Sequence, residues 1–197
     1  MTHNFSLKMM TRASLFAALT AVGAYIAIPF PLSPAPVSLQ TLFVLLAGLV
    51  LGKKWGAASM AVYLLAGAAG LPVFAGGAGG IGYFAGPTGG YLAGFVPAAF
   101  VIGAISEKRA GIVFDAAALA LGSLIIYALG VSWLTFHTGF SFSKTLMIGM
   151  VPFLPGDALK IAAAVWIAGR IRPGTRPELI QPDLDRPKPP TPAPPSD

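Results

Sequence analysis

The sequence contains no cysteine and only two histidines among its 197 residues. The absence of cysteine excludes disulfides, thiolate nucleophiles and thiolate metal ligands together. His3 lies near the N-terminus and His137 in a segment expected to be a loop, and neither has an acidic cluster beside it that would complete a metal site. We therefore expect no metal centre, no cofactor and no enzymatic activity.

Charged residues are also scarce. Only 10% of the residues are charged and 55% are hydrophobic, whereas a soluble domain carries about 25% charged residues. This composition predicts an integral membrane protein in contact with lipid. The net charge is +6, but the basic residues are spread over the expected loops and form no patch interleaved with aromatic residues, so we expect no nucleic-acid partner.

The long apolar segments predict how often the chain crosses the membrane. A spanning helix needs about 20 mostly apolar residues, and such segments lie near residues 12–30, 38–52, 55–71, 88–106, 111–131 and 146–170. The last is interrupted around residues 152–155, which include two prolines. The sequence therefore predicts an all-α membrane protein with six transmembrane helices, formed by one domain over residues 1–172.

The positions of lysine and arginine predict the direction of these spans, because basic residues accumulate on the cytoplasmic side. Alternate loops, at 31–37, 72–87 and 132–145, carry only Lys144. The other loops and ends, which would all lie on one side, carry Lys8, Arg12, Lys53, Lys54, Lys108, Arg109, Arg170, Arg172 and Arg176. Both termini are thus expected in the cytoplasm. Residues 173–197, rich in proline and charge, are expected to form a disordered cytoplasmic tail.

An acid and a base lie three residues apart near the outer end of the sixth span. A charge in hydrocarbon costs about 3 kcal/mol on insertion scales, so such groups usually face a cavity and a partner. Pro155 and Gly156 interrupt the chain, which places Asp157 in the first turn of a new helix, where the dipole favours an anion. Lys160 would share its face at i+3. The pair predicts a polar ligand site or, alternatively, an ordinary helix start with a snorkelling lysine.

The outer loops have an unusual composition. Three prolines stiffen residues 31–40, and eight glycines crowd residues 76–90 among aromatic side chains. Glycine permits close approach of the backbone to a ligand, and aromatic rings supply the flat apolar walls that a ring-shaped ligand needs. The glycines indicate a binding loop, or alternatively a flexible connection or close packing between helices.

A stripe of small residues follows one side of the first span, with Ala13, Ala17 and Ala21 at four-residue intervals. Small side chains at this spacing let another helix approach closely. The stripe indicates either packing within the protein or a surface for a partner subunit.

Four motifs, in order along the chain, closely resemble the BioY family. They are LQTLF at 39–43 behind the proline loop, GLPVFAGG at 70–77, GPTGGY at 86–91 and FLPGDALK at 153–160. The family comprises the biotin-binding S components of energy-coupling-factor transporters. The resemblance covers about residues 8–170 and leaves out the proline-rich tail.

The resemblance implies a membrane-embedded subunit of high affinity for biotin, the transported ligand, with its site near the outer surface. Asp157 and Lys160 match the family's polar pair. The other binding residues expected from the motifs and the aromatic loop are Gln40, Phe74, Gly76, Gly77, Tyr83, Thr88, Gly89, Gly90 and Tyr91. Some members carry asparagine where this chain has Gly76 or Gly77, so a side-chain contact there would be replaced by backbone or water.

Biotin carries a ureido group with two N–H donors and one carbonyl, an apolar bicycle with its tail, and a carboxylate. Asp157 could accept from the ureido N–H groups, and Lys160 could donate either to the ureido oxygen or to the carboxylate. The resemblance further implies a multi-pass protein of the bacterial inner (plasma) membrane. Its alanine stripe, Ala13, Ala17 and Ala21, would dock onto a transmembrane coupling subunit driven by two ATPase subunits.

Three other functions are consistent with parts of the sequence. An S component for another small vitamin would share the fold, and only the motifs argue against it. A self-sufficient channel or facilitator would line its path with polar groups through the membrane depth, whereas here the polar groups collect at one end. An intramembrane enzyme using Asp157 and Lys160 would need a nucleophile or a metal set, and neither accompanies them.

Overall fold

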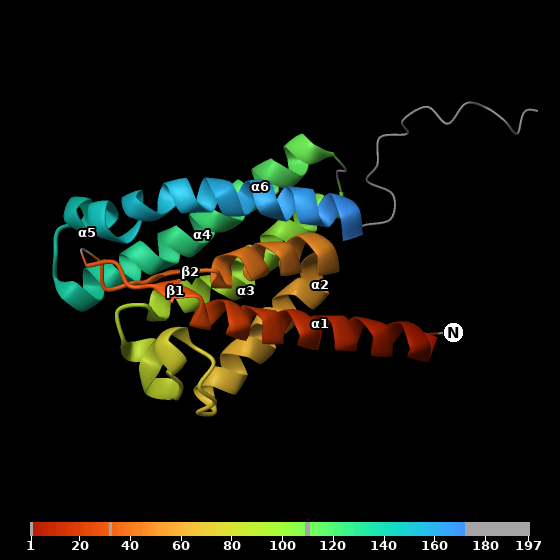
Figure 1. Cartoon of the computed structure of the whole chain (residues 1–197), viewed down its shortest axis with the longest axis horizontal. Coiled ribbons are helices and arrows are strands. Elements are labelled where there is room, and N and C mark those ends of the chain that lie inside the picture. The colour runs from red at the N-terminus through yellow and green to blue at the C-terminus, as the bar shows by residue number, and fades with distance from the viewer. Residues whose placement is uncertain (1, 32, 109–110, 172–197) are drawn as a thin grey trace, which may run out of the picture.

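The chain is a bundle of helices in the computed structural model, which describes residues 2–31, 33–108 and 111–171 (Figure 1). The residues of the predicted tail, 173–197, lie outside the described residues. The helices are α1 Thr2–Tyr25, α2 Gln40–Ala68, α3 Gly89–Ser106, α4 Ile112–Thr138, α5 Phe142–Gly149 and α6 Leu154–Ile171. Between them lie the antiparallel strands β1 Ala27–Ile28 and β2 Val37–Ser38, and the short 3₁₀ helices η1 Ala75–Gly77, η2 Ile81–Ala85 and η3 Val151–Phe153.

Helix α2 folds back on itself at Gly52. This residue has φ 78° and ψ 179°, outside the helical region, and glycine adopts a positive φ without a steric penalty. A Cβ atom placed on Gly56 would lie 2.9 Å from the Ala47 carbonyl oxygen and 2.9 Å from the Gly48 Cα. On a straight helix, residues eight apart are about 12 Å apart. The halves 40–51 and 53–68 therefore form a tight hairpin, which Figure 1 shows as a reversal of α2.

The end of α3 holds this hairpin turn. The Lys53 backbone N–H donates to Glu107 Oε1 at 2.9 Å, and the Lys53 ammonium pairs with Glu107 Oε2 at 3.2 Å. Gly103 lets the two segments touch, because a Cβ at this position would lie 2.2 Å from the Lys53 backbone nitrogen. One carboxylate thus satisfies a backbone donor that the turn leaves without a helical partner.

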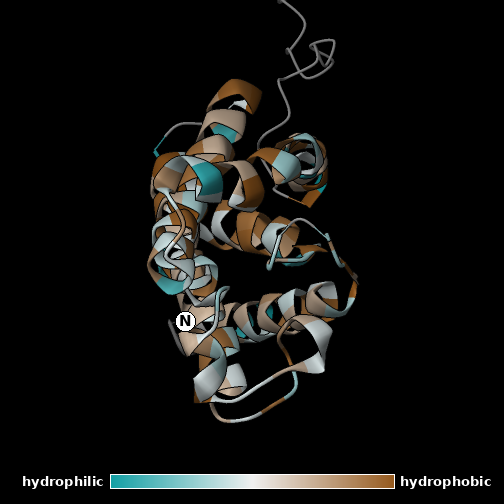
Figure 2. Cartoon of the chain, turned by 90° about the vertical axis from the view of Figure 1, so that its left-hand side faces the viewer, coloured by the Kyte–Doolittle hydropathy of each residue, from teal (hydrophilic) through white to brown (hydrophobic). Residues whose placement is uncertain are grey.

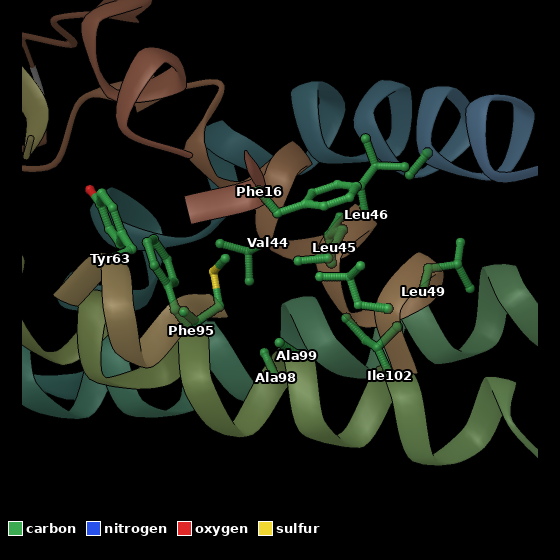
Figure 3. Packing of buried hydrophobic residues seen from close by; sticks show 14 of the residues in the cluster. Phe16, Val44, Leu45, Leu46, Leu49, Tyr63, Phe95, Ala98, Ala99 and Ile102 are labelled. Carbon is green, nitrogen blue, oxygen red and sulfur yellow. The ribbon is translucent and has the colours of Figure 1, made fainter. Parts of the chain in front are cut away.

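The core lies between α1, α2 and α3 and extends to α4. Figure 3 shows Phe16 from α1, Leu45 from α2 and Ile102 from α3 within one cluster of buried side chains. Close backbone contact supplements this packing, since a Cβ on Gly48 would meet the Ala99 carbonyl oxygen at 2.7 Å. Helices in a membrane associate through such van der Waals contact, because lipid tails are as apolar as the side chains that the contact buries.

The outside of the bundle is apolar as well. Val113, Phe136 and Leu159 expose 77%, 82% and 74% of their surface, and hydrophobic colouring predominates on the helices in Figure 2. Four helical stretches in the described part of the chain are long and apolar enough to cross a membrane: Gln40–Ala68, Gly89–Ser106, Ile112–Thr138 and Phe142–Ile171. These features are those of an integral membrane protein.

Two boundaries differ from the sequence-based expectation. The loop expected at 132–145 is largely helical, because no glycine or proline interrupts residues 131–138 and the helix ends only where Gly139 adopts φ 67°. His137 therefore lies exposed in the last turn of α4, and not in a loop. The first helix ends at Tyr25, short of the expected residue 30, because β1 follows and the chain then meets Pro29 and Pro31.

The tight hairpin generates a prediction about stability. We expect Gly56→Ala to lower the free energy of unfolding by about 1–3 kcal/mol, the usual cost of overpacking, because its methyl group would meet backbone atoms. Thermal unfolding of the purified protein in detergent measures the effect. The matched control is Gly169→Ala on α6, where no atom lies within 4 Å of the added Cβ. Equal stability of the two variants would contradict the close contact between the halves of α2.

Candidate binding site

A cavity opens at the end of the bundle that lies opposite the N-terminus, where β1, β2 and α5 are found (Figure 1). Its empty volume is about 710 Å³ including the part open to the outside, within the range of roughly 300–1,000 Å³ that is usual for small-molecule sites. The lining residues are Ala35, Pro36, Ser38, Thr41, Ala75, Tyr83, Thr88, Tyr91, Leu92, Phe95, Ser123, Ile126, Tyr127, Phe153, Asp157 and Lys160. The helices α2, α3, α4 and α6 therefore contribute to one site, together with the connection between α1 and α2 and the connection between α2 and α3.

Asp157 and Lys160 form a buried ion pair in this cavity. Their exposed fractions are 7% and 9%, and Lys160 Nζ lies 3.1 Å from Asp157 Oδ1. Lys160 also donates to Thr41 Oγ1 at 2.8 Å, and the Tyr127 hydroxyl donates to Asp157 Oδ2. Burying two charges is costly unless further hydrogen bonds satisfy them. Here α2 and α4 supply those bonds to a pair carried by α6.

The ion pair keeps unused hydrogen-bonding capacity. An ammonium has three donors and a carboxylate about four acceptor sites, and the contacts within the protein use two donors and two acceptor sites. No other charged side chain among the described residues lines the cavity. The site therefore offers a ligand an adjacent donor and acceptor in an electrically neutral setting.

Aromatic rings form much of the remaining wall. Tyr91 and Tyr127 meet edge to face, with ring centroids 6.4 Å apart and an interplanar angle of 89°. The Tyr91 hydroxyl donates to the Gly149 carbonyl oxygen at 2.8 Å, which anchors this ring to the end of α5. Phe95 and Phe153 add apolar surface. Such walls suit a ligand with an apolar ring system.

Five of the residues expected from the sequence line the cavity: Asp157, Lys160, Tyr83, Thr88 and Tyr91. Two others lie behind its wall. Gln40 is 6% exposed and donates to the Tyr63 hydroxyl. Phe74 is fully buried and stacks on Tyr83, with ring centroids 5.0 Å apart.

The expected glycines lie outside the lining and serve local packing and turns. A Cβ on Gly89 would lie 1.8 Å from the Phe84 carbonyl oxygen, and one on Gly90 would lie 2.2 Å from Trp133 Cβ. Gly76 and Gly77 adopt φ 75° and 73°, so they form the turn that follows Ala75 on the cavity wall. Close packing, the alternative reading of these glycines, accounts for Gly89 and Gly90.

Several lining residues were missed by the sequence reasoning, above all Tyr127 and Thr41, which bind the two charges directly. Tyr127 had a usable signal, since it is a hydroxyl in the apolar run from residue 124 to 131 and would need a partner within the membrane. Phe95, Ser123 and Ile126 carried no such signal. Their place in the wall depends on how α3 packs against α4 and how α4 packs against α6.

The alanine stripe of α1 lies largely inside the bundle. Ala13 and Ala17 are 6% and 7% exposed and belong to the core, whereas Ala21 is half-buried. Ser59 on α2 donates to the Ala13 carbonyl oxygen at 2.7 Å, a contact that needs the two helices close together. Packing within the protein therefore accounts for Ala13 and Ala17.

Comparison with known proteins agrees with these features. Residues 1–176 match the BioY family. The chain is 45% identical over 166 residues to the biotin transporter BioY of Thermotoga maritima, and the aligned residues cover 84% of this chain and 96% of that protein. It is 44% identical over 168 residues to the probable biotin transporter BioY of Pyrococcus horikoshii, covering 85% and 98%.

The fold is also found among solved structures. A crystal structure of the S-component for biotin from an ECF-type ABC transporter matches with a TM-score of 0.83 and 30% sequence identity, over 87% of this chain and 94% of that one. Sequence and fold agree over nearly the whole length of these proteins, and the chain therefore belongs to the BioY family.

Proposed function

We propose that this chain is the membrane-embedded, high-affinity biotin-binding subunit of an ECF-type uptake transporter. Family membership and the match to a biotin S-component support this function. The observation that carries it is the buried Asp157–Lys160 pair, which offers the only charges of the described cavity lining to a ligand between aromatic walls. Binding and release of biotin would involve no covalent step.

The electrostatics of the cavity favour one orientation of biotin. The ion pair is neutral, so a neutral ureido group placed against it leaves the site neutral. Asp157 would accept from a ureido N–H while Lys160 donates to the ureido oxygen. A carboxylate in the same place would leave an uncompensated negative charge buried, which is costly. The ureido ring would therefore lie on the ion pair, with the valerate carboxylate toward the mouth.

The fold supports six membrane crossings, by α1, the two halves of α2, α3, α4 and α6, with both termini in the cytoplasm of a bacterial cell. The N-terminus, the turn at Gly52 and the end of α6 lie at the same end of the bundle (Figure 1). That end also carries Lys53, Lys54 and Lys108, as expected for the cytoplasmic side. The cavity lies at the opposite, outer end.

The first prediction for this function concerns the ion pair. We expect Asp157→Asn and Lys160→Ala to weaken biotin binding by about 1.5–3 kcal/mol, the range for hydrogen bonds to charged groups. Calorimetric titration of the purified protein in detergent, without ATP, measures the affinity. Biotin methyl ester should bind to the unaltered protein nearly as well as biotin does, because only the ureido end would meet the pair.

The control for these variants is Lys144→Ala, since Lys144 is exposed on α5 and lies over the Phe140 ring, outside the cavity lining. Unchanged affinity in both ion-pair variants would remove the pair from the site. No biotin binding by the unaltered protein would contradict the proposed function itself.

A second prediction concerns Tyr127, which the sequence reasoning missed. Tyr127→Phe keeps the ring against Tyr91 but removes the hydroxyl that donates to Asp157. We expect a loss of about 0.5–1.5 kcal/mol in biotin affinity, the net value of one hydrogen bond, because Asp157 would be less firmly oriented. Thr135→Val removes a hydroxyl from the same helix that bonds only to the Val131 carbonyl oxygen. If both variants lose affinity equally, Tyr127 has no special part in the site.

The proposed partners are a transmembrane coupling subunit and two ATPase subunits, with α1 as the docking helix. Because Ala13 and Ala17 are buried, the surface that α1 offers consists of exposed residues such as Ala18, with the half-buried Ala21 at its edge. We expect Ala18→Trp to reduce biotin uptake in cells that supply the partners, while the isolated variant still binds biotin. Val62→Trp, on an exposed side of α2, is the control. Full uptake by Ala18→Trp would exclude this face of α1 from docking.

A further inference from the structure

The walls of the cavity include two outer segments that are distant in sequence. Residues 33–39 contribute Ser38 among others, and residues 70–88 contribute Ala75 among others. A ligand held between these segments contacts both of them, so movement of one relative to the other affects how readily it leaves. What holds them together therefore bears directly on how long the ligand stays.

A chain of side-chain hydrogen bonds joins the two segments behind the cavity wall. Ser38 Oγ donates to Gln40 Oε1 at 3.0 Å, and Gln40 Nε2 donates to the Tyr63 hydroxyl. The Tyr63 hydroxyl donates in turn to the Val73 carbonyl oxygen at 3.0 Å. The chain thus begins at one lining residue, Ser38, and ends two residues before another, Ala75.

The direction of this chain is determined by its donors. A tyrosine hydroxyl has one proton, and here that proton goes to Val73, so the oxygen accepts from Gln40. Gln40 and Tyr63 are 6% and 1% exposed, so water does not readily replace a lost partner. Breaking either bond leaves buried polar groups unsatisfied, which makes the bonds mutually dependent.

The Tyr63 ring also contacts the cavity wall from behind. It meets Phe74 edge to face at 5.6 Å between ring centroids and stacks near Phe95 at 6.4 Å. Figure 3 shows Tyr63 beside Phe95, and Phe95 itself lines the cavity. Replacement of Tyr63 by phenylalanine would keep these ring contacts and remove only the hydroxyl.

We infer that Gln40 and Tyr63 are positioning residues that hold the two outer segments in one fixed relation and so set the residence time of the bound ligand. Neither residue lines the cavity; both act through Ser38 and through the backbone around Val73. The ligand part of this inference rests on the proposed biotin binding, whereas the coupling between the segments can be tested in the ligand-free protein.

The first experiment measures amide hydrogen exchange in the ligand-free protein, since local opening is read directly by exchange. Each substitution removes a hydroxyl on one side of the chain of bonds, and amide exchange is measured in the segment at the other end. We expect Ser38→Ala to speed exchange at residues 73–78, where the Phe74 N–H donates to the Ala78 carbonyl oxygen. Tyr63→Phe should speed exchange at residues 36–39, where the Leu39 N–H donates to the Gly23 and Ile26 carbonyl oxygens.

Trp133→Phe is the matched control for exchange. Trp133 Nε1 donates to the Gly86 carbonyl oxygen at 2.8 Å, so it holds the same 70–88 segment through α4 and not through Gln40. We expect this variant to speed exchange near residue 86 and to leave residues 36–39 unchanged. Unchanged exchange at the remote ends in Ser38→Ala and Tyr63→Phe would overturn the coupling.

The second experiment measures the dissociation rate of labelled biotin from the purified protein. We expect Gln40→Met and Tyr63→Phe each to raise this rate about tenfold, the factor that corresponds to one hydrogen bond. The double variant should be no more than about threefold faster than either single variant, because both changes break one chain. A hundredfold effect of the double variant, or no effect of the singles, would overturn the positioning role. If the unaltered protein binds no biotin, the proposed function fails while the exchange experiment still decides the coupling.

Discussion

The buried ion pair of Asp157 and Lys160 is the constraint on which the rest of the site depends. Two charges in an apolar bundle are tolerated only when their remaining hydrogen bonds are satisfied by fixed partners. Thr41 and Tyr127 supply those bonds from α2 and α4, so three helices must meet at one place and in one register. The cavity is formed where they meet. Tyr127 belongs to this contact, and α3 adds Tyr91 and Phe95 to the aromatic wall.

The meeting of these helices depends on glycine at a few close contacts. Gly52 reverses α2 within one residue, and Gly48 and Gly56 let its halves touch each other and α3. In a membrane the hydrophobic effect does not drive apolar helices together. This close approach therefore stabilises their association through van der Waals contact. The hairpin brings Thr41 to Lys160 from one of its halves and Tyr63 behind the cavity wall from the other. The same reversal therefore shapes both the binding site and the layer of residues behind its wall.

The glycine-rich segment shows that residue type does not by itself place a residue relative to the cavity. Its glycines predict close approach of the backbone to a ligand, and in the structure Gly89 and Gly90 closely approach Phe84 and Trp133. The aromatic residues of the same segment divide in two, because Tyr83 lines the cavity and Phe74 lies beneath it. Gln40 likewise belongs to the expected motif but lies behind the wall. Residue type indicates what a group can do, and only packing decides which side of the wall it occupies.

The sequence by itself determined the membrane environment, the helical class, the position of the hairpin turn and the presence of an acid and a base on one face of α6, because composition, glycine, proline and helical periodicity are local properties. Only the tertiary structure decided that Tyr127 and Thr41 complete the ion pair and that Ala13 and Ala17 pack inward. It also decided that Gln40 and Tyr63 link the two outer segments. The hydrogen bonds of Gln40 to Tyr63, of Tyr127 to Asp157 and of Lys160 to Thr41 join residues 23 to 119 positions apart. Their pairing is determined by how the helices cross, which local sequence does not encode.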